Sequence, residues 1–251
     1  MTPKRRFVLT VSQQFQGRAT FLANFAGDNK LSDGNGHGTH VAGTIGGVDY
    51  GVAKKTKLYA VKVLNANGSG TTAGVIAGMD FVTADSATRS CPNGTVANMS
   101  LGGSKSTAIN AAAAAMVRAG VFLAVAAGNS DDDANFYSPA SEVTACTVGA
   151  SDNTDTRAWF SNYGSVVDIF APGVDVLSAW IGNPTATETI SGTSMASPHI
   201  AGLGAYLLAL LGPKSPEALC SYIKDTATLN ALTDIPVGTV NALAYNGFAT
   251  A

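Results

Sequence analysis

The chain has 251 residues, of which 46% are hydrophobic and 13% are charged. This composition is typical of a compact globular protein and excludes an intrinsically disordered chain. The formal net charge of −2 gives no electrostatic reason to expect binding to nucleic acid or to an acidic membrane. The length suits one α/β domain with a sizeable core.

The sequence shows no clear membrane or export signal. No stretch reaches the roughly 18 unbroken apolar residues of a membrane span. The apolar run at residues 7–11 is shorter than the ~7–15 residues of a signal-peptide core, and no clean cleavage pattern follows it. We therefore expect no membrane partner.

Strand and helix patterns alternate from about residue 57 onward. Strands are expected at residues 57–64, 96–101, 121–126, 145–150 and 166–170, and helices at 71–84, 106–119, 195–211 and 215–226. The continuous apolar run 121–126 is typical of a parallel strand buried on both faces. Residues 195–211 are apolar almost all round, which predicts a buried central helix. The alternation predicts an α/β fold, a mostly parallel sheet with helices on both faces.

Ser194 lies where a glycine-containing loop meets the predicted central helix. A serine at a helix N-terminus faces unpaired backbone N–H groups, which can stabilise an oxyanion. The simpler interpretation is a helix cap, the usual reason for serine at such a place. Ser191 and Ser197 are nearby hydroxyls with no partner motif.

His37 lies in the segment 33–40, Asp-Gly-Asn-Gly-His-Gly-Thr-His. The glycines let the backbone bend tightly and expose the imidazole. His37 and His40 are three residues apart, whereas the zinc pattern on a helix spaces two histidines by four with a glutamate between them. We therefore favour a base at His37 over a metal pair, and a packing or capping role for His40 and His199.

Asn129 follows the apolar run 121–128, so it is expected at the carboxyl edge of the sheet. Ligand-binding and catalytic groups concentrate at that edge in open α/β sheets. A side-chain amide there can donate to a developing oxyanion. A turn asparagine is the alternative.

Taken together, these segments resemble the subtilisin family of serine proteases, in its proteinase K-like branch. The resemblance runs from about residue 17 to the C-terminus and is carried by residues 33–44, 50–64, 98–103, 124–129, 162–173 and 191–199. It implies a subtilisin-like three-layer sandwich, with a peptidase domain at residues 17–251. Residues 1–16 form a divergent segment in place of the family's catalytic-aspartate strand.

The resemblance also implies roles in peptide-bond hydrolysis. Ser194 would be the nucleophile and His37 its base, and Asn129 with the Ser194 N–H would form the oxyanion hole. The walls of the primary specificity pocket would be two segments, Ser100, Leu101 and Gly102 with Ala126, Ala127 and Gly128. Their small residues favour substrates with apolar or aromatic side chains, with broad tolerance.

Further features implied by the resemblance concern stability and location. A structural calcium ion would be held by the Asp168 carboxylate and the carbonyls of Val143 and Ala145, since calcium prefers oxygen ligands. Cys146 and Cys220 match a family disulfide, which suits a secreted protein. Catalysis would need no cofactor, and we expect a monomer acting on polypeptides.

One element of the pattern is absent from the sequence. Counting back from Gly17 by the family's spacing to its catalytic aspartate reaches Arg5, and residues 1–27 contain no Asp or Glu. The strand-like stretch 6–11 carries no carboxylate. Cys91 also lacks its family partner, which lies just before that aspartate. A truncated or misassembled N-terminus explains both differences and is the preferred hypothesis.

These observations leave the activity of the chain open. Asp28 and Asp33 are the nearest acids in the sequence, but the family uses an acid at the Asp33 position structurally. Without an orienting carboxylate the imidazole can adopt the wrong tautomer, and kcat falls about 10⁴-fold. The leading expectation is therefore a serine endopeptidase with strongly reduced activity. The alternatives are a peptide-binding pseudoprotease and an esterase that uses the same Ser194 and His37.

Overall fold

The structure is a computed structural model that describes residues 12–247. Its main sheet has six strands in the order β11-β12-β8-β7-β5-β3. The strands β3 (Thr95–Met99), which lies at one edge, β5 (Val121–Ala126), β7 (Cys146–Ser151) and β8 (Ile169–Pro172) are all parallel. The short β11 (Thr228–Leu229) pairs antiparallel with β12 (Ala242–Leu243) at one edge. The sheet class predicted from the sequence is confirmed.

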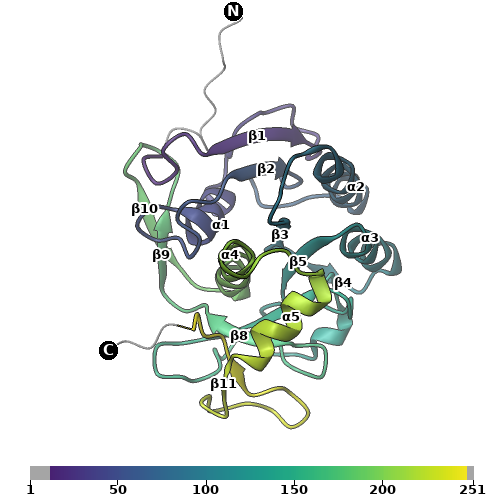
Figure 1. Ribbon diagram of the computed structural model, residues 1–251, viewed down its shortest axis with the longest axis vertical. Helices are drawn as coiled ribbons and strands as arrows, with labels where there is room; N and C mark the ends of the chain where they lie inside the picture. Colours follow the sequence, from purple (N-terminus) through teal and green to yellow (C-terminus); the bar gives the residue numbers. More distant parts are fainter. Residues whose placement is uncertain (1–11, 248–251) are drawn as a thin grey trace, which may run out of the picture.

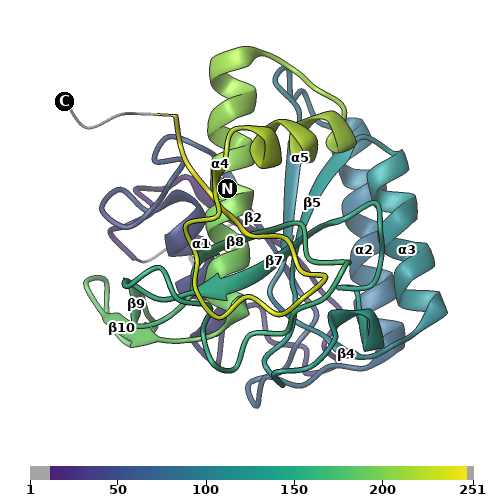
Figure 2. The same cartoon turned by 90° about the horizontal axis from the view of Figure 1, so that it is seen from below.

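Helices cover both faces of this sheet (Figures 1 and 2). On one face lie α4 (Thr193–Leu211) and α5 (Pro216–Asp225), and on the other lie α2 (Thr72–Thr88) and α3 (Thr107–Arg118). Strand β5 explains this arrangement, because its side chains point alternately to the two faces of the sheet. Phe122 and Ala124 pack with α4 and α5, whereas Leu123 and Val125 pack with α3.

A second, smaller unit contains the histidine motif. Its strands β1 (Ala19–Asn24) and β2 (Leu58–Lys62) pair in parallel with each other and with no other strand of the described chain. They pack through Phe15, Ala19 and Leu58 near α1 (His37–Gly46). Figure 1 shows β1 and β2 on one side of α4, and β5 and β8 on the other.

Two short antiparallel strand pairs complete the described fold. The strands β9 (Val176–Ala179) and β10 (Thr187–Ile190) form an antiparallel pair beside α1. The strands β4 (Gly103–Ser104) and β6 (Tyr137–Ser138) form another, and a 3-10 turn, η2 (Ala134–Phe136), precedes β6.

Helix α4 is long and apolar enough to satisfy the length and composition of a membrane span, the one such helix in residues 12–247. Most of it is buried inside the protein, however, with Met195, Ile200 and Ala201 at 1% exposure or less. It is therefore a core helix, as the apolar pattern of residues 195–211 predicts.

The expected elements differ from the structure mainly at their ends. The strand expected at residues 166–170 is β8 at Ile169–Pro172, because Val167 closes a turn onto Gly164 and pairing in the sheet begins only after it. Strand β1 and the pair β9–β10 were not predicted, since their sequences show no clear alternation. The strand-like stretch 6–11 and most of the predicted segment 1–16 lie outside the described residues.

Candidate active site

Ser194 is in the first turn of α4, which begins at Thr193 after Gly192. The half-buried side chain donates a weak hydrogen bond of 3.4 Å to the carbonyl oxygen of Ser100. No side-chain cap is formed at this helix end. The capping alternative for Ser194 is therefore not what the structure shows.

The side chain of Asn129 is held in one orientation by Thr193. Its Oδ1 accepts hydrogen bonds from the Thr193 backbone N–H and hydroxyl, both at 2.8 Å. The amide nitrogen is thereby left free to donate elsewhere. A Cβ atom built on Gly192 would lie 3.6 Å from both Asn129 Nδ2 and the Ser194 backbone nitrogen. The two N–H donors therefore border the same small space.

A cavity of about 190 Å³ opens beside these donors. Five of the six residues expected to form a specificity pocket line it, namely Leu101, Gly102, Ala126, Ala127 and Gly128. Ser100 does not; its hydroxyl donates to the carbonyl oxygen of Ser194 at 2.7 Å. No charged residue lines this cavity.

The walls of the cavity are held by residues whose importance the sequence did not reveal. The side chain of Asn162 donates to the Ala127 carbonyl oxygen at 2.9 Å and accepts from the N–H groups of Ser130 and Asp132. Gly128 has φ = 108° and approaches Asn162 so closely that a Cβ would lie 2.3 Å from its amide nitrogen. Only glycine fits there.

The other wall is tied to α4 by a chain of polar side chains. Ser197 donates to Asn98 at 2.7 Å, and Asn98 donates to Ser100 at 2.9 Å. Ser197 shows no partner motif in the sequence, yet here it connects β3 to the start of α4. Its partner Asn98 lies within the motif 98–103, which was the available signal.

His37 is the first residue of α1. The preceding Gly36 has φ = 104°, and a Cβ on it would lie 2.4 Å from the Trp180 ring, so the loop requires glycine. The half-buried imidazole lines a second, larger cavity between β2 and β3. Within residues 12–247, no hydrogen bond joins the His37 ring to Ser194 or to any carboxylate.

Asp33 caps α1 and is fully used in doing so. Its Oδ1 accepts from the N–H groups of Asn35 and Gly36, and its Oδ2 accepts from the N–H and hydroxyl of Thr39, at 2.7–2.9 Å. Burial raises the pKa of this carboxyl, but the four hydrogen bonds outweigh it and lower the pKa below its usual range. Asp33 therefore has no oxygen directed at His37.

Burial lowers the pKa of His37, and the nearby charge of Asp33 raises it in part. The net direction is downward. The lowered pKa favours the neutral imidazole, which is the state that a general base requires.

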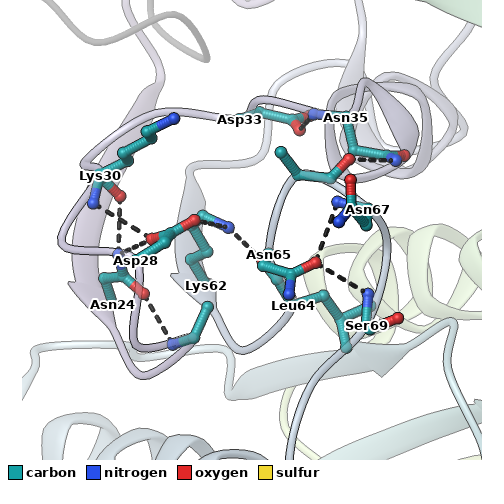
Figure 3. A network of polar contacts seen from close by, with 12 residues as sticks. Asn24, Asp28, Lys30, Asp33, Asn35, Lys62, Leu64, Asn65, Asn67 and Ser69 are labelled. Carbon is teal, nitrogen blue, oxygen red and sulfur yellow. Dashed lines mark hydrogen bonds and ion pairs between the residues drawn. The ribbon is translucent and has the colours of Figure 1, made fainter.

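The carboxylate of Asp28 is also held by other groups (Figure 3). It accepts from the Asn24 side chain at 2.7 Å and from the Lys30 N–H at 3.1 Å, and it forms an ion pair with Lys62 at 3.1 Å. The Asn24 and Lys30 hydrogen bonds are the main reason why its pKa falls to about 2. Neither acid considered from the sequence bonds to His37.

The other two histidines have structural partners. The fully buried His40 bonds through Nε2 to the Val176 carbonyl oxygen at 2.9 Å, and its own carbonyl accepts from Ser178 at 2.8 Å. His199 bonds through Nδ1 to the Met195 carbonyl oxygen at 2.8 Å. The packing roles expected for both agree with these contacts.

The predicted calcium carboxylate already has a cation beside it. Asp168 Oδ1 pairs with Lys224 Nζ at 2.7 Å, and Oδ2 accepts from the Thr147 N–H at 2.9 Å. The Lys224 side chain is 41% exposed, so this pair is not locked in the interior. Close by, Cys146 and Cys220 form a disulfide, as the resemblance implies, and Cys91 is free.

The comparisons with known proteins agree on one family. Residues 22–247 match the model of the subtilase family, described as Peptidase_S8. The chain belongs to the subtilase family.

Individual relatives support this assignment over nearly the whole chain. The subtilase domain is 64% identical to a cuticle-degrading protease of Metarhizium anisopliae over 93% of this chain, and 59% identical to proteinase T of Parengyodontium album over 97% of it. It spans 60% of the first relative's length and 82% of the second's.

A solved structure gives the same result for the fold. A cold-adapted subtilisin-like serine proteinase is 45% identical and superposes with a TM-score of 0.89, covering 97% of this chain and 86% of that one. The subtilisin-like α/β fold expected from the motifs is therefore confirmed.

The substitution Asp33→Asn tests the capping role of this carboxylate. We expect a loss of about 1–3 kcal/mol in the free energy of unfolding, because partly buried donors lose a charged acceptor. Because the folded-state pKa of Asp33 is depressed, its contribution is complete above the unfolded value of about 3.9 and fades as the pH falls below it.

Urea unfolding at pH 7 and at pH 3 measures both effects. The exposed Asp225, at the end of α5, provides the control Asp225→Asn. An equal stability loss in the two variants at pH 7 would contradict the capping role.

Proposed function

We propose that this chain is built as a serine endopeptidase of the subtilisin type. The observation that carries the proposal is the pair of N–H donors, Asn129 Nδ2 and the Ser194 backbone nitrogen, on one space beside the 190 Å³ cavity. Such a pair binds the oxyanion of a tetrahedral intermediate, and losing one donor costs about 10²–10³ in rate.

The reaction follows from these groups. Ser194 Oγ attacks the carbonyl carbon of the scissile peptide bond while His37 accepts the hydroxyl proton. The carbonyl oxygen becomes the oxyanion and accepts from the two N–H donors. When the intermediate collapses, His37 returns the proton to the leaving amine and an acyl-enzyme remains on Ser194. Water then attacks the ester by the same route and releases the acid.

We expect the rate to be strongly reduced because no carboxylate in residues 12–247 bonds to His37. An orienting acid fixes the tautomer and direction of the imidazole, and its loss lowers kcat about 10⁴-fold in triads of this kind. The missing hydrogen bond between His37 and Ser194 agrees with a poorly directed base.

The same observation supports a second function, peptide binding without turnover. The pocket and its polar supports are complete, whereas the catalytic pair is not joined. Binding and bond cleavage depend on different residues, so experiment can separate them. Ester hydrolysis is a third outcome, because an activated ester demands less of the base.

A fluorophosphonate that reacts with activated serine distinguishes these functions. We expect labelling of Ser194 that is slow but dependent on His37, at least 10²-fold faster in the wild type than in His37→Ala. Asn129→Ala should lower the rate about 10²–10³-fold. Since burial lowers the pKa of His37, the rate should rise with pH around a midpoint below the ordinary value near 6.5.

Ser191→Ala is the matched control, because the Ser191 hydroxyl bonds only to Asp175, accepting from its backbone N–H and donating to its carboxylate. Its labelling rate should equal that of the wild type. Labelling that persists unchanged in His37→Ala would contradict the enzyme. Measurable binding of peptides to a chain that is never labelled would establish the peptide-binding alternative.

The residues that line the cavity also bear on substrate specificity. Its lining is uncharged and includes Ala126, Ala127, Ala140 and Tyr137, so we infer a preference for apolar or aromatic side chains before the scissile bond. Placing a charge there without a partner is costly.

We therefore expect peptides with Phe or Leu at this position to bind at least 10-fold more tightly than peptides with Lys or Asp. Isothermal titration of the Ser194→Ala variant measures this without cleavage. Equal affinity for all four peptides would overturn the inference.

We propose that Asp168 holds a structural calcium ion in competition with Lys224, with the carbonyl oxygens of Val143 and Ala145 as further ligands. All-oxygen ligation suits calcium. The ammonium of Lys224 already balances the Asp168 charge, so calcium must displace it. The half-exposed lysine side chain can move into solvent.

Replacing Lys224 should therefore strengthen the calcium effect. We expect a larger rise in Tm on adding calcium chloride to Lys224→Gln than to the wild type, and no such rise with magnesium chloride. Lys55 is exposed and lies far from Lys224 in the sequence, so Lys55→Gln is the control. An identical calcium response in all three proteins would exclude this site.

We further propose that the protein functions outside the reducing cytosol, as a monomer acting on polypeptides. The Cys146–Cys220 disulfide supports the oxidising compartment.

A further inference from the structure

The sequence contains three segments of the form Asn-x-Ser or Asn-x-Thr whose middle residue is not proline. They are Asn67-Gly68-Ser69, Asn93-Gly94-Thr95 and Asn98-Met99-Ser100. This pattern is the acceptor for N-linked glycosylation, and a glycosylated asparagine lies on the surface of the folded protein. A fourth segment, 183–185, has proline in the middle and is excluded. The structure distinguishes among the other three.

Asn98 is excluded by its contacts. It lies within β3, where its Nδ2 donates to the Ser100 hydroxyl at 2.9 Å and its Oδ1 accepts from Ser197 at 2.7 Å. A glycan is attached through Nδ2, so an oligosaccharide on Asn98 would displace the Ser100 hydroxyl and separate β3 from α4. The folded structure is therefore incompatible with a glycan on Asn98.

Asn67 is exposed but lies beside the candidate active site. Its loop is closed by Asn65, whose Oδ1 accepts from the Asn67 N–H at 2.9 Å (Figure 3). Between them, the Ala66 carbonyl oxygen accepts from the side chain of Asn35, two residues before His37. An oligosaccharide on Asn67 would therefore stand beside the base and hinder a polypeptide substrate.

Asn93 is exposed in a turn between α2 and β3, and its neighbours Pro92 and Gly94 are exposed as well. The backbone of this turn is fixed, because the Gly94 N–H donates to the Cys91 carbonyl oxygen at 3.0 Å. Gly94 has φ = 111°, and a Cβ there would lie 3.2 Å from Leu208, so the turn packs against α4. The Asn93 side chain makes no hydrogen bond within residues 12–247, and its Nδ2 can carry a substituent.

The position of Asn93 keeps a glycan away from the candidate active site. Strand β3 runs from Thr95 to Met99, and Ser100 just after its carboxyl end bonds to Ser194. At about 3.3 Å per residue, the two ends of this strand are roughly 13 Å apart. Since Asn93 precedes the amino end, an oligosaccharide there leaves the pocket and the two N–H donors open.

We propose that Asn93 is an N-glycosylation site of the protein when it passes through a eukaryotic secretory pathway. In the transfer, Asn93 Nδ2 forms a bond to the anomeric carbon of an oligosaccharide carried on a polyisoprenyl diphosphate. The bond from that carbon to the diphosphate oxygen breaks, the polyisoprenyl diphosphate leaves, and Nδ2 gives one proton to a base of the transferase. The Thr95 hydroxyl completes the acceptor. The proposal rests on the proposed function outside the cytosol and not on the endopeptidase activity.

Secretion of the full chain from yeast behind a cleavable leader tests the proposal. Digestion with a peptide N-glycosidase in heavy-oxygen water converts a glycosylated asparagine to labelled aspartate, and mass spectrometry of the peptides locates it. A mock digestion without the glycosidase accounts for spontaneous deamidation of Asn-Gly pairs. We expect the label at Asn93, and none at Asn98 or Asn183.

Single substitutions test the acceptor residue by residue. Asn93→Gln and Thr95→Ala should each abolish the glycan at this turn, whereas Thr95→Ser should retain it because the hydroxyl remains. Asn153→Gln is the matched control, since Asn153 is exposed but is followed by Thr154 and Asp155 and so lacks the acceptor pattern. The glycosidase-sensitive shift on a gel is scored in the cells as well as in the medium. A variant that fails to fold is therefore still tested, because transfer precedes folding.

The distance of Asn93 from the candidate active site has its own measurement. The affinity of the Ser194→Ala variant for the peptide with Phe before the scissile position should be the same before and after removal of the glycan. A change in this affinity would contradict the placement of the glycan away from the pocket.

The outcomes separate this proposal from the proposed function. Secreted protein that contains the Cys146–Cys220 disulfide but no label at Asn93 would overturn the glycosylation site. A glycan on Asn67 in place of Asn93, or one that persists in Thr95→Ala, would overturn it too. Glycosylated protein in which both cysteines of that disulfide remain thiols would instead refute the oxidising compartment. Absent His37-dependent labelling of Ser194, with or without the glycan, would refute only the endopeptidase.

Discussion

The junction between the end of β5 and the start of α4 is the constraint on which the candidate active site depends. Asn129 Oδ1 accepts two hydrogen bonds from Thr193, so the strand end and the helix start cannot move independently. The same bonds turn the amide nitrogen toward the space beside Ser194. Buried residues such as Ile200 fix α4 against the sheet. Nucleophile, amide donor and pocket therefore form one rigid unit.

His37 belongs to the other unit of the protein. Its helix is anchored through His40 to Val176 and Ser178 of β9, and β1 and β2 pack beside it. Helix α1 also packs against α4, but in residues 12–247 no strand ladder connects β2 to β3. A ladder sets register, whereas apolar packing is non-directional. In the described chain the position of the base relative to the nucleophile is thus set by helix packing and not by a strand ladder.

The fold and most candidate residues could be predicted because their signals are local. The apolar run of β5 and the glycine-rich loops before His37 and Ser194 are visible in the sequence itself. The roles of Asn162 and Ser197 could not be predicted, since each acts through partners at least 30 residues away. Strand β1 was missed for a related reason, because its pairing with β2 and not its own pattern defines it. The Lys224–Asp168 pair likewise joins residues 56 positions apart.

The carboxylate that is missing here would act on His37 in two ways, and this structure lets the two be considered separately. A triad carboxylate stabilises the imidazolium by its charge, and it fixes the tautomer by accepting a hydrogen bond. The charge of Asp33 raises the pKa of His37 and so supplies part of the first effect. It supplies none of the second, because both of its oxygens accept from Asn35, Gly36 and Thr39. Freeing Asp33 from these bonds would unmake the loop that positions His37. A carboxylate that orients the ring must therefore come from outside α1 and its cap, and on that side His37 lines the cavity of about 1690 Å³ between β2 and β3.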